Sequence, residues 1–108
     1  MTTFHPCIII PCYNHGKELA AYLPRVTQSR YPVIVVDDGS AEAEAQLIHE
    51  VCEATQAVLV TMPENMGKWN AVLTGMQYAL NSGYTHALQC DADGQHHESH
   101  IASFIELA

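Results

Sequence analysis

The octapeptide VIVVDDGS, residues 33–40, joins a short apolar run to an acidic turn. Four consecutive apolar β-branched residues are typical of a strand that is buried on both faces. Asp37 and Asp38 mark the end of that strand, because a charge inside the run would be buried without a partner. Ser40 suits the N-cap position of a following helix, because its hydroxyl can accept a hydrogen bond from a free N–H group of the first turn. We therefore predict a buried strand, a turn and a helix with Ser40 as its N-cap.

The same alternation extends outward in both directions along the chain. Further apolar runs occupy residues 7–10, 57–60 and 85–90. Apolar side chains recur at helical spacing in three intervening segments: Leu19, Tyr22, Leu23 and Val26; Leu47, Ile48, Val51 and Cys52; Trp69, Val72, Leu73, Met76 and Leu80. Strands that alternate with amphipathic helices predict an α/β fold, a Rossmann-like parallel sheet with helices on both faces. We expect the strand order 3-2-1-4.

Several local features refine this prediction. Pro24 is expected to kink or restart the first helix, because it lacks the backbone donor that a helix interior needs. Residues 81–83 are expected to end the third helix in a left-handed cap. Trp69 occupies a position that predicts packing in the core. A fourth helix is expected from near Glu98, with these apolar residues in register: Ile101, Phe104 and Ile105.

Composition narrows the class of protein. The 108 residues carry 4 basic and 12 acidic side chains, a formal charge of −8, and 48% are hydrophobic. So few basic residues exclude a general nucleic-acid binder. No apolar run approaches the roughly 20 residues of a membrane span, and no secretory signal is visible, so the expected compartment is the cytoplasm. The four cysteines are not in a CxxC arrangement and predict buried free thiols.

Polar clusters follow each of the four predicted strands, at the edge where ligands of parallel sheets bind. Asp91 and Asp93 form a DxD motif after the fourth strand. Paired carboxylates suit a hard divalent cation that also bridges phosphate oxygens, which is how Mg²⁺ or Mn²⁺ supports a departing nucleotide. A solvated turn is the alternative for an isolated DxD. The position of the glycine excludes an EF-hand loop.

The remaining clusters suggest contacts to a nucleotide. Asp37 or Asp38 can accept a hydrogen bond from a base N–H or a ribose hydroxyl. Asn65, Gly67 and Lys68 open the third helix, where backbone N–H groups and a lysine can hold an anion. His96, His97 and His100 also permit a zinc site, although solvated or supporting histidines fit the spacing better.

Taken together, four motifs resemble one family. They are Ile9-Ile10-Pro11-Cys12-Tyr13-Asn14, Val35-Val36-Asp37-Asp38-Gly39-Ser40, Asn65-Met66-Gly67-Lys68 and Asp91-Ala92-Asp93-Gly94-Gln95-His96. In this order they resemble the nucleotide-sugar half of family 2 glycosyltransferases with the GT-A fold. The last motif looks most like the branch that includes dolichyl- and polyprenyl-phosphate sugar transferases. Three positions depart from the usual pattern, His15, the pair Trp69-Asn70 and Glu98, and they leave the substrate preference open.

The resemblance implies a role for each matching residue. Pro11, Tyr13 and Asp38 would hold the base, and Asp37 and Asp91 would support the ribose and diphosphate. Lys68 would approach the phosphate, and Asp93 would be the direct metal ligand beside Asp91, with Mg²⁺ or Mn²⁺ as cofactor. The full set of implied nucleotide-sugar contacts is Pro11, Tyr13, Asn14, Asp37, Asp38, Gly39, Asn65, Gly67, Lys68, Asp91, Ala92 and Asp93.

The resemblance also implies what the chain lacks. Residues 1–108 correspond to the nucleotide-sugar-binding part of a catalytic domain, so the acceptor-binding half and the catalytic base are expected after Ala108. We expect the parent to transfer a sugar from a nucleotide-diphosphate sugar to a lipid-linked or glycan acceptor, in the cytoplasm or at the cytoplasmic face of a membrane. The isolated chain is expected to be inactive and to self-associate through an unpaired strand edge or the apolar residues near its end.

A non-catalytic nucleotide-binding or scaffolding domain remains an alternative to the transferase. A receiver domain and a haloacid-dehalogenase-type phosphatase do not fit, because both carry their acidic motif after the first strand. Here the acidic pairs follow the second and fourth predicted strands.

Overall fold

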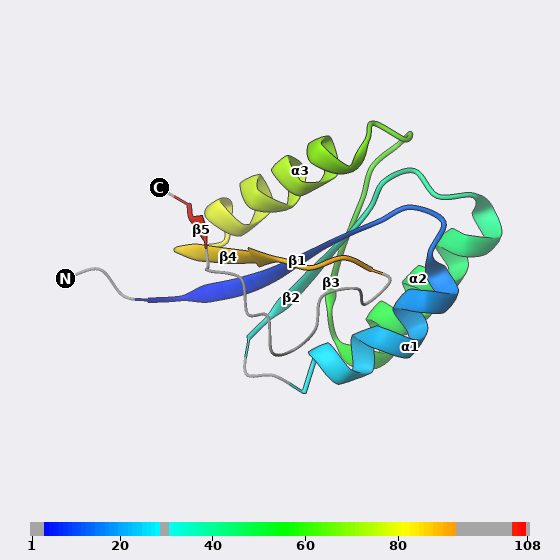
Figure 1. Cartoon of the computed structure of the whole chain (residues 1–108), viewed down its shortest axis with the longest axis horizontal. Helices are drawn as coiled ribbons and strands as arrows, with labels where there is room; N and C mark the ends of the chain where they lie inside the picture. Colours follow the sequence, from blue (N-terminus) through cyan, green and yellow to red (C-terminus); the bar gives the residue numbers. More distant parts are fainter. Residues whose placement is uncertain (1–3, 29–30, 93–104, 108) are drawn as a thin grey trace.

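A computed structural model describes residues 4–28, 31–92 and 105–107 (Figure 1). The elements in chain order are β1 (Pro6–Cys12), α1 (Gly16–Val26), β2 (Val33–Asp37), α2 (Glu42–Thr55), β3 (Val58–Thr61), α3 (Lys68–Asn81), β4 (His86–Gln89) and β5 (Ile105–Glu106). The sheet order is β3-β2-β1-β4-β5. The first four strands pair in parallel, and β5 is antiparallel to β4. The predicted α/β architecture and the order 3-2-1-4 are confirmed.

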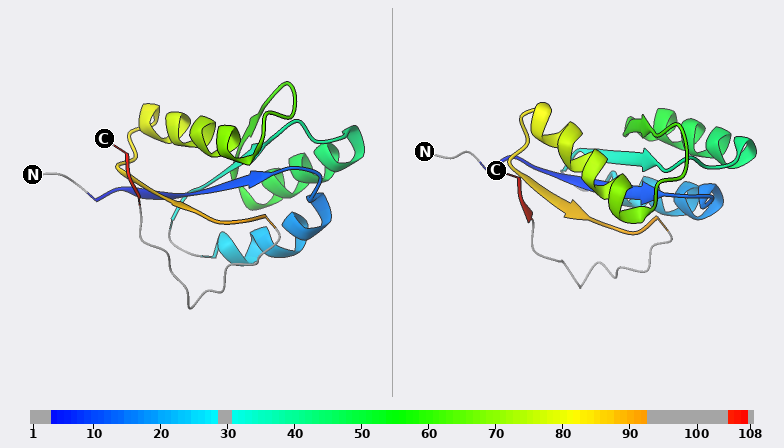
Figure 2. Two further views of the ribbon diagram at one scale, coloured as in Figure 1. Left: turned by 45° about the horizontal axis from the view of Figure 1, so that its top comes forward. Right: turned by 90° about the horizontal axis from the view of Figure 1, so that it is seen from above.

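Helices cover both faces of the sheet, as Figure 2 shows. Strand β1 is buried along its whole length and alternates between the two faces. Its Ile8 and Ile10 join a core cluster with side chains of α1 and α2. Its Ile9 joins a second cluster on the opposite face, beneath α3. The central strand therefore belongs to both cores, which explains its continuous apolar run.

Small residues bring α3 close to the sheet. Ala71, Gly75 and Ala79 recur every fourth residue and are buried. A Cβ atom at Gly75 would lie 2.6 Å from Cγ2 of Ile9 and 3.0 Å from Cγ2 of Val36. The helix backbone therefore rests directly on the side chains of β1 and β2.

The prediction that Trp69 packs in the core was wrong. Its side chain is 66% exposed, and Leu73 and Leu80 on the same helix are 44% and 46% exposed. The close approach at Gly75 explains this outcome, because the stripe of small residues faces the sheet and turns the large side chains away from it. Hydrophobic periodicity was right for Val72 and Met76, which pack in the core, but it missed the stripe of small residues that sets the centre of the buried face.

The start of α2 also differs from the local prediction. Ser40 is not the N-cap of α2, because the helix begins at Glu42 after Ala41. Instead Asn14 accepts a hydrogen bond from the Ala41 N–H at 2.8 Å, and the Asn14 N–H donates to the Ser40 hydroxyl at 3.0 Å. A residue from the turn after β1 thus satisfies a donor that precedes α2.

The carboxyl-terminal ends of α1 and α3 were also predicted. Helix α1 continues through Pro24 to Val26, so the proline lies in its last turns and the helix does not restart there. The third helix ends as predicted: Gly83 has φ +92°, and the Tyr84 N–H donates back to the Ala79 carbonyl at 3.0 Å.

The end of the described chain is a strand at Ile105, where we expected a helix. Ile105 pairs with Ala87 and Glu106 pairs with His86. The reason is that β4 presents unpaired backbone groups at its outer edge, which an antiparallel segment can satisfy. The remainder of the expected fourth helix lies outside the described residues.

The four cysteines are confirmed as buried free thiols. Among the described residues, every helix is too short or too polar to cross a bilayer.

Candidate functional site

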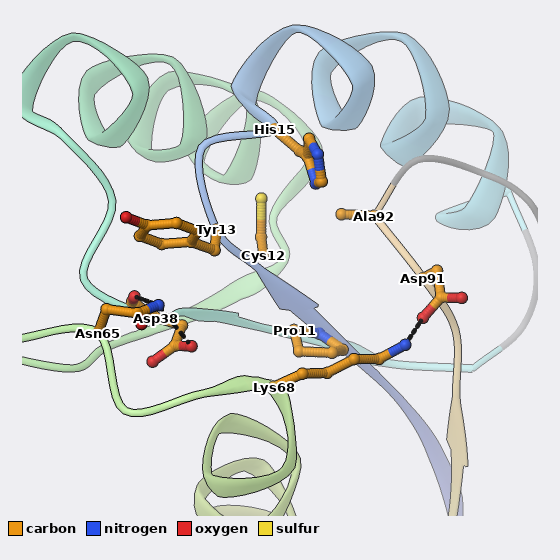
Figure 3. A pocket seen from close by; sticks show the side chains of 9 residues that line it. All are labelled: Pro11, Cys12, Tyr13, His15, Asp38, Asn65, Lys68, Asp91 and Ala92. Atoms are coloured by element: carbon orange, nitrogen blue, oxygen red, sulfur yellow. Dashed lines mark hydrogen bonds and ion pairs between the residues drawn. The ribbon is translucent and has the colours of Figure 1, made fainter.

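A pocket of about 330 Å³ lies at the carboxyl-terminal edge of the sheet, where the four polar clusters converge (Figure 3). Its lining residues are Pro11, Cys12, Tyr13, His15, Asp38, Asn65, Lys68, Asp91 and Ala92. They come from the end of β1 and from the chain segments that follow β1, β2, β3 and β4. This convergence is the expected consequence of parallel strands, whose carboxyl ends share one edge.

Figure 3 shows two sides of the pocket. Tyr13, Asp38 and Asn65 lie on one side, and Asp91 and Ala92 lie on the other. The Lys68 side chain extends between them to Asp91. An aromatic ring and a carboxylate thus face a lysine and a second carboxylate across a space large enough for part of a nucleotide.

Asp38 is the most buried charged residue of the pocket, with 2% of its surface exposed. Its Oδ1 accepts a hydrogen bond from the Met66 N–H at 2.8 Å, and its Oδ2 accepts one from Nδ2 of Asn65 at 3.0 Å. The same amide nitrogen donates to the Asp38 carbonyl at 3.1 Å. One carboxylate therefore joins the loop after β2 to the loop before α3.

Gly39 permits this close contact between the loops. It has φ +70°, and a Cβ atom there would lie 2.3 Å from the backbone nitrogen of Asn65. A side chain would fit neither the left-handed conformation nor the space. Gly39 thus shapes the site without lining it.

Asp37 is equally buried but does not line the pocket. Its Oδ1 accepts a hydrogen bond from the Ser40 N–H at 2.9 Å, so this carboxylate closes the turn after β2. Asn14 connects the turn after β1 to the same region through Ser40 and Ala41. Both residues support the walls of the pocket.

Lys68 and Asp91 form an ion pair across the pocket. The lysine Nζ donates to Asp91 Oδ1 at 2.5 Å, and the Gln89 Nε2 donates to the same oxygen at 2.9 Å. The Lys68 side chain is 61% exposed and that of Asp91 is 23% exposed. Lys68 is the first residue of α3 and follows Gly67, which has φ +96°. The turn at Gly67 therefore directs the start of the helix toward β4.

The structure brings seven of the predicted site residues into the pocket lining: Pro11, Tyr13, Asp38, Asn65, Lys68, Asp91 and Ala92. Asp37 at the end of β2 and the turn residues Asn14, Gly39 and Gly67 are absent from the lining. Asp93 and the three histidines of the possible zinc site lie outside the described residues.

Two lining residues were not among the predicted contacts, Cys12 and His15. Only their position in the sequence could have indicated this role, because both lie where β1 ends and the following turn begins. Burial raises the pKa of the Cys12 thiol to about 12, an effect that a hydrogen bond from the His15 backbone only partly opposes. Cys12 is therefore a wall residue with little thiolate character at neutral pH.

The pocket contains few groups that could bind a metal ion. Within the described ranges, no three His, Cys, Asp or Glu side chains are grouped closely enough to hold an ion by themselves. Asp91 nevertheless already holds a cation, the Lys68 ammonium, on Oδ1. Carboxylate oxygen suits Mg²⁺ and Mn²⁺, which take further ligands from phosphates and water. Asp91 therefore offers one oxygen ligand of the kind that such an ion takes alongside phosphate.

Comparison with curated proteins identifies relatives of known class. The poly-beta-1,6-N-acetyl-D-glucosamine synthase of Staphylococcus aureus is 31% identical over 88 residues, which cover 79% of this chain and 21% of the relative. The undecaprenyl-phosphate 4-deoxy-4-formamido-L-arabinose transferase of Aeromonas hydrophila is 31% identical over 109 residues, or 94% of this chain and 32% of the relative. The chain thus spans about a fifth to a third of these proteins.

Solved structures give the same picture. A mannosyltransferase from Pyrobaculum calidifontis, in complex with GDP-Man and Mn²⁺, matches with a TM-score of 0.69 and 26% identity, over 82% of this chain and 27% of that one. S. aureus TarS 1–349 with UDP matches in fold with a TM-score of 0.67 at 20% identity, over 82% and 27% of the two chains. The likeness establishes the amino-terminal part of a GT-A fold.

The sequence profile of one family, described as Glycosyl transferase family 2, matches residues 7–108. This range contains all four motifs and all of the pocket lining. The chain belongs to glycosyltransferase family 2.

Proposed function

We propose that the pocket binds the nucleotide diphosphate of an activated sugar, and that the full-length protein transfers this sugar to an acceptor. The observation that carries the proposal is the convergence of Tyr13, Asp38, Lys68 and Asp91 in one pocket from four separate segments. An aromatic face, a buried acceptor, a cation and a metal-binding carboxylate are the groups that a base, a ribose and a diphosphate require.

The two sides of the pocket suit the two ends of such a ligand. Pro11, Tyr13 and Asp38, which line the pocket, would stack on the base and hydrogen-bond it. Each Asp38 oxygen already accepts one hydrogen bond and has a second lone pair for a base N–H. Lys68 reaches across the pocket to Asp91, and this pair would contact the diphosphate. Asp37 would support the ribose and diphosphate indirectly, by closing the turn after β2.

Asp91 and Asp93 would hold Mg²⁺ or Mn²⁺. When bound, the ion would neutralise the diphosphate and stabilise it as a leaving group. The relative with GDP-Man also carries Mn²⁺, which supports a divalent cation at this site. Asp93 would bind the ion directly. Asp91 would bind Lys68 when the site is empty and the ion when it is present.

No catalytic base is assigned to this chain. An inverting transfer needs a group that takes the acceptor proton, and we place that group, with the acceptor-binding half, beyond residue 108. The acceptor would be a lipid-linked molecule or a glycan, and the protein would act in the cytoplasm or at the cytoplasmic face of a membrane. The relative named for undecaprenyl phosphate supports the lipid-linked choice.

Self-association of the 108-residue chain is also proposed, but the antiparallel strand at Ile105 reduces the open edge of β4 that first suggested it. Exposed apolar residues on α3, including Trp69 and Leu73, offer another contact surface. Sedimentation velocity over a wide concentration range tests this proposal, and a monomer at every concentration would contradict it.

Calorimetry with UDP, GDP and CDP tests the proposed donor site. One nucleotide should bind in the presence of Mn²⁺ or Mg²⁺ and lose its affinity in EDTA. Asp93→Asn should weaken binding more than Asp91→Asn, because it removes the direct ligand of the ion. Glu53→Gln, an exposed position on α2, is the matched control and should bind normally. Equal affinity in EDTA would refute the metal site, and no binding of any nucleotide would refute the donor site.

A further inference from the structure

The Lys68–Asp91 pair joins two elements that are distant in sequence. Lys68 begins α3, and Asp91 follows β4. Oδ1 of Asp91 accepts from the charged Lys68 ammonium at 2.5 Å and from the neutral Gln89 amide at 2.9 Å. A single carboxylate oxygen therefore carries two donors of different charge.

A divalent ion on this carboxylate would lie within a few ångströms of the ammonium. Two like charges at that distance repel strongly in a partly desolvated pocket. The Gln89 amide carries no charge, so the ion would not repel it in this way. The Lys68 stem is flexible and its side chain is largely exposed, so it has room to move.

We propose that Lys68 is an internal counterion, which occupies Asp91 in the ligand-free chain and leaves it for the phosphate when a divalent cation binds. The inference rests on the proposed donor site and adds an exchange step to it. Gln89 is the positioning residue that keeps Asp91 oriented while the two cations exchange.

Lys68 would then have opposite effects on two ligands. Without the lysine, a metal ion would no longer compete with the Lys68 ammonium for Asp91. The diphosphate, however, would lose a charge-assisted hydrogen bond. Loss of a residue that only contacts phosphate would change the affinity for the diphosphate and leave the affinity for the metal ion unchanged. Loss of a residue that only stabilises the fold would strengthen the binding of neither ligand.

Calorimetry on the 108-residue chain separates these roles. With Mn²⁺ alone, Lys68→Met should bind about two- to fivefold more tightly than the unaltered chain, as expected for removal of a half-exposed ion pair. With UDP or GDP at saturating Mn²⁺, the same variant should bind at least about tenfold more weakly. Lys17→Met is the control, because Lys17 is the other lysine of the chain, is exposed on α1 and does not line the pocket.

A spectroscopic measurement follows the exchange directly. The NMR signals of the Lys68 side chain should shift on addition of Mg²⁺ alone, with the Lys17 signals as an internal reference. The proposal is overturned if Lys68→Met binds Mn²⁺ no more tightly than Lys17→Met, if Mn²⁺ binds none of the chains, or if the Lys68 signals do not respond. Failure of the proposed donor site would look different from failure of the exchange. In that case no nucleotide would bind the unaltered chain, even at saturating metal.

Discussion

At the scale of single residues, Asp38 shows how a candidate ligand-binding group can also hold the site together. The family resemblance assigns its carboxylate to the base, while the structure adds hydrogen bonds from Asn65 and Met66, residues 27 and 28 positions away. These contacts leave Asp38 only 2% exposed and pin two loops together. Its substitution should therefore affect stability as well as binding.

Asp38→Asn should lower the free energy of unfolding by about 1–3 kcal/mol, because one acceptor oxygen becomes an amide that faces another N–H donor. Urea unfolding of the ligand-free chain measures the change. Glu64→Gln makes the same chemical change at an exposed neighbouring position and should stay within about 0.5 kcal/mol of the original chain. Equal stabilities for the two variants would show that the Asp38 contacts contribute nothing to the fold.

At the scale of elements, the position of α3 depends on its small residues. Ala71, Gly75 and Ala79 let the helix lie directly on β1 and β2, and the start of the helix then carries Lys68 to Asp91. The packing of this helix and the geometry of the pocket are therefore coupled through one rigid element.

Gly75→Ala should destabilise the chain by about 1–3 kcal/mol. Alanine normally favours a helix over glycine by about 1 kcal/mol, but the added methyl would lie 2.6 Å from Ile9. Gln77→Ala, on the exposed side of α3, is the control and should change stability little. A stabilising Gly75→Ala would mean that helix propensity outweighs the contact with the sheet.

Trp69 provides a second test at this scale, since it is the single tryptophan of the chain. Because its side chain is 66% exposed, its fluorescence should resemble that of indole in water and be quenched readily by acrylamide. Trp69→Ala should cost less than about 1 kcal/mol of stability, whereas Val72→Ala at a buried position should cost about 2 kcal/mol. A blue-shifted, protected tryptophan would instead support the core position that hydrophobic periodicity suggested.

At the scale of the whole molecule, the buried thiols make the fold sensitive to alkaline pH. Burial raises the pKa of Cys7 and of Cys52 to about 11 and that of Cys12 to about 12, from an ordinary value of 9. Below pH 9 these thiols are protonated in both the folded and the unfolded chain. Above pH 9 the unfolded chain loses these protons first, so stability falls as the pH rises toward 12.

Under reducing conditions, the free energy of unfolding should therefore drop between pH 8 and pH 10, by roughly 1 kcal/mol for each buried thiol. Urea titrations at the two pH values measure the drop. Cys52→Ala removes one such thiol, and its stability should fall less steeply over the same interval. Parallel losses in the two proteins would assign the alkaline effect to groups other than Cys52.

Much of the architecture was predictable from local patterns. The apolar runs and helical spacings predicted β1 to β4, the three helices between them and the order of the parallel strands. The convergence of the polar motifs also followed, because parallel strands place all their carboxyl ends at one edge. Periodicity and turn chemistry act over a few residues and are therefore visible in the sequence itself.

The sequence by itself thus determined the α/β alternation, the family and the edge of the sheet that carries the site. Only the tertiary structure decided which face of α3 meets the sheet, that Asn14 rather than Ser40 holds the backbone just before α2, and that Lys68 reaches Asp91. Each of these outcomes depends on how closely two elements approach, and the approach is set by side-chain volume and unsatisfied backbone groups that meet only when distant segments pack together.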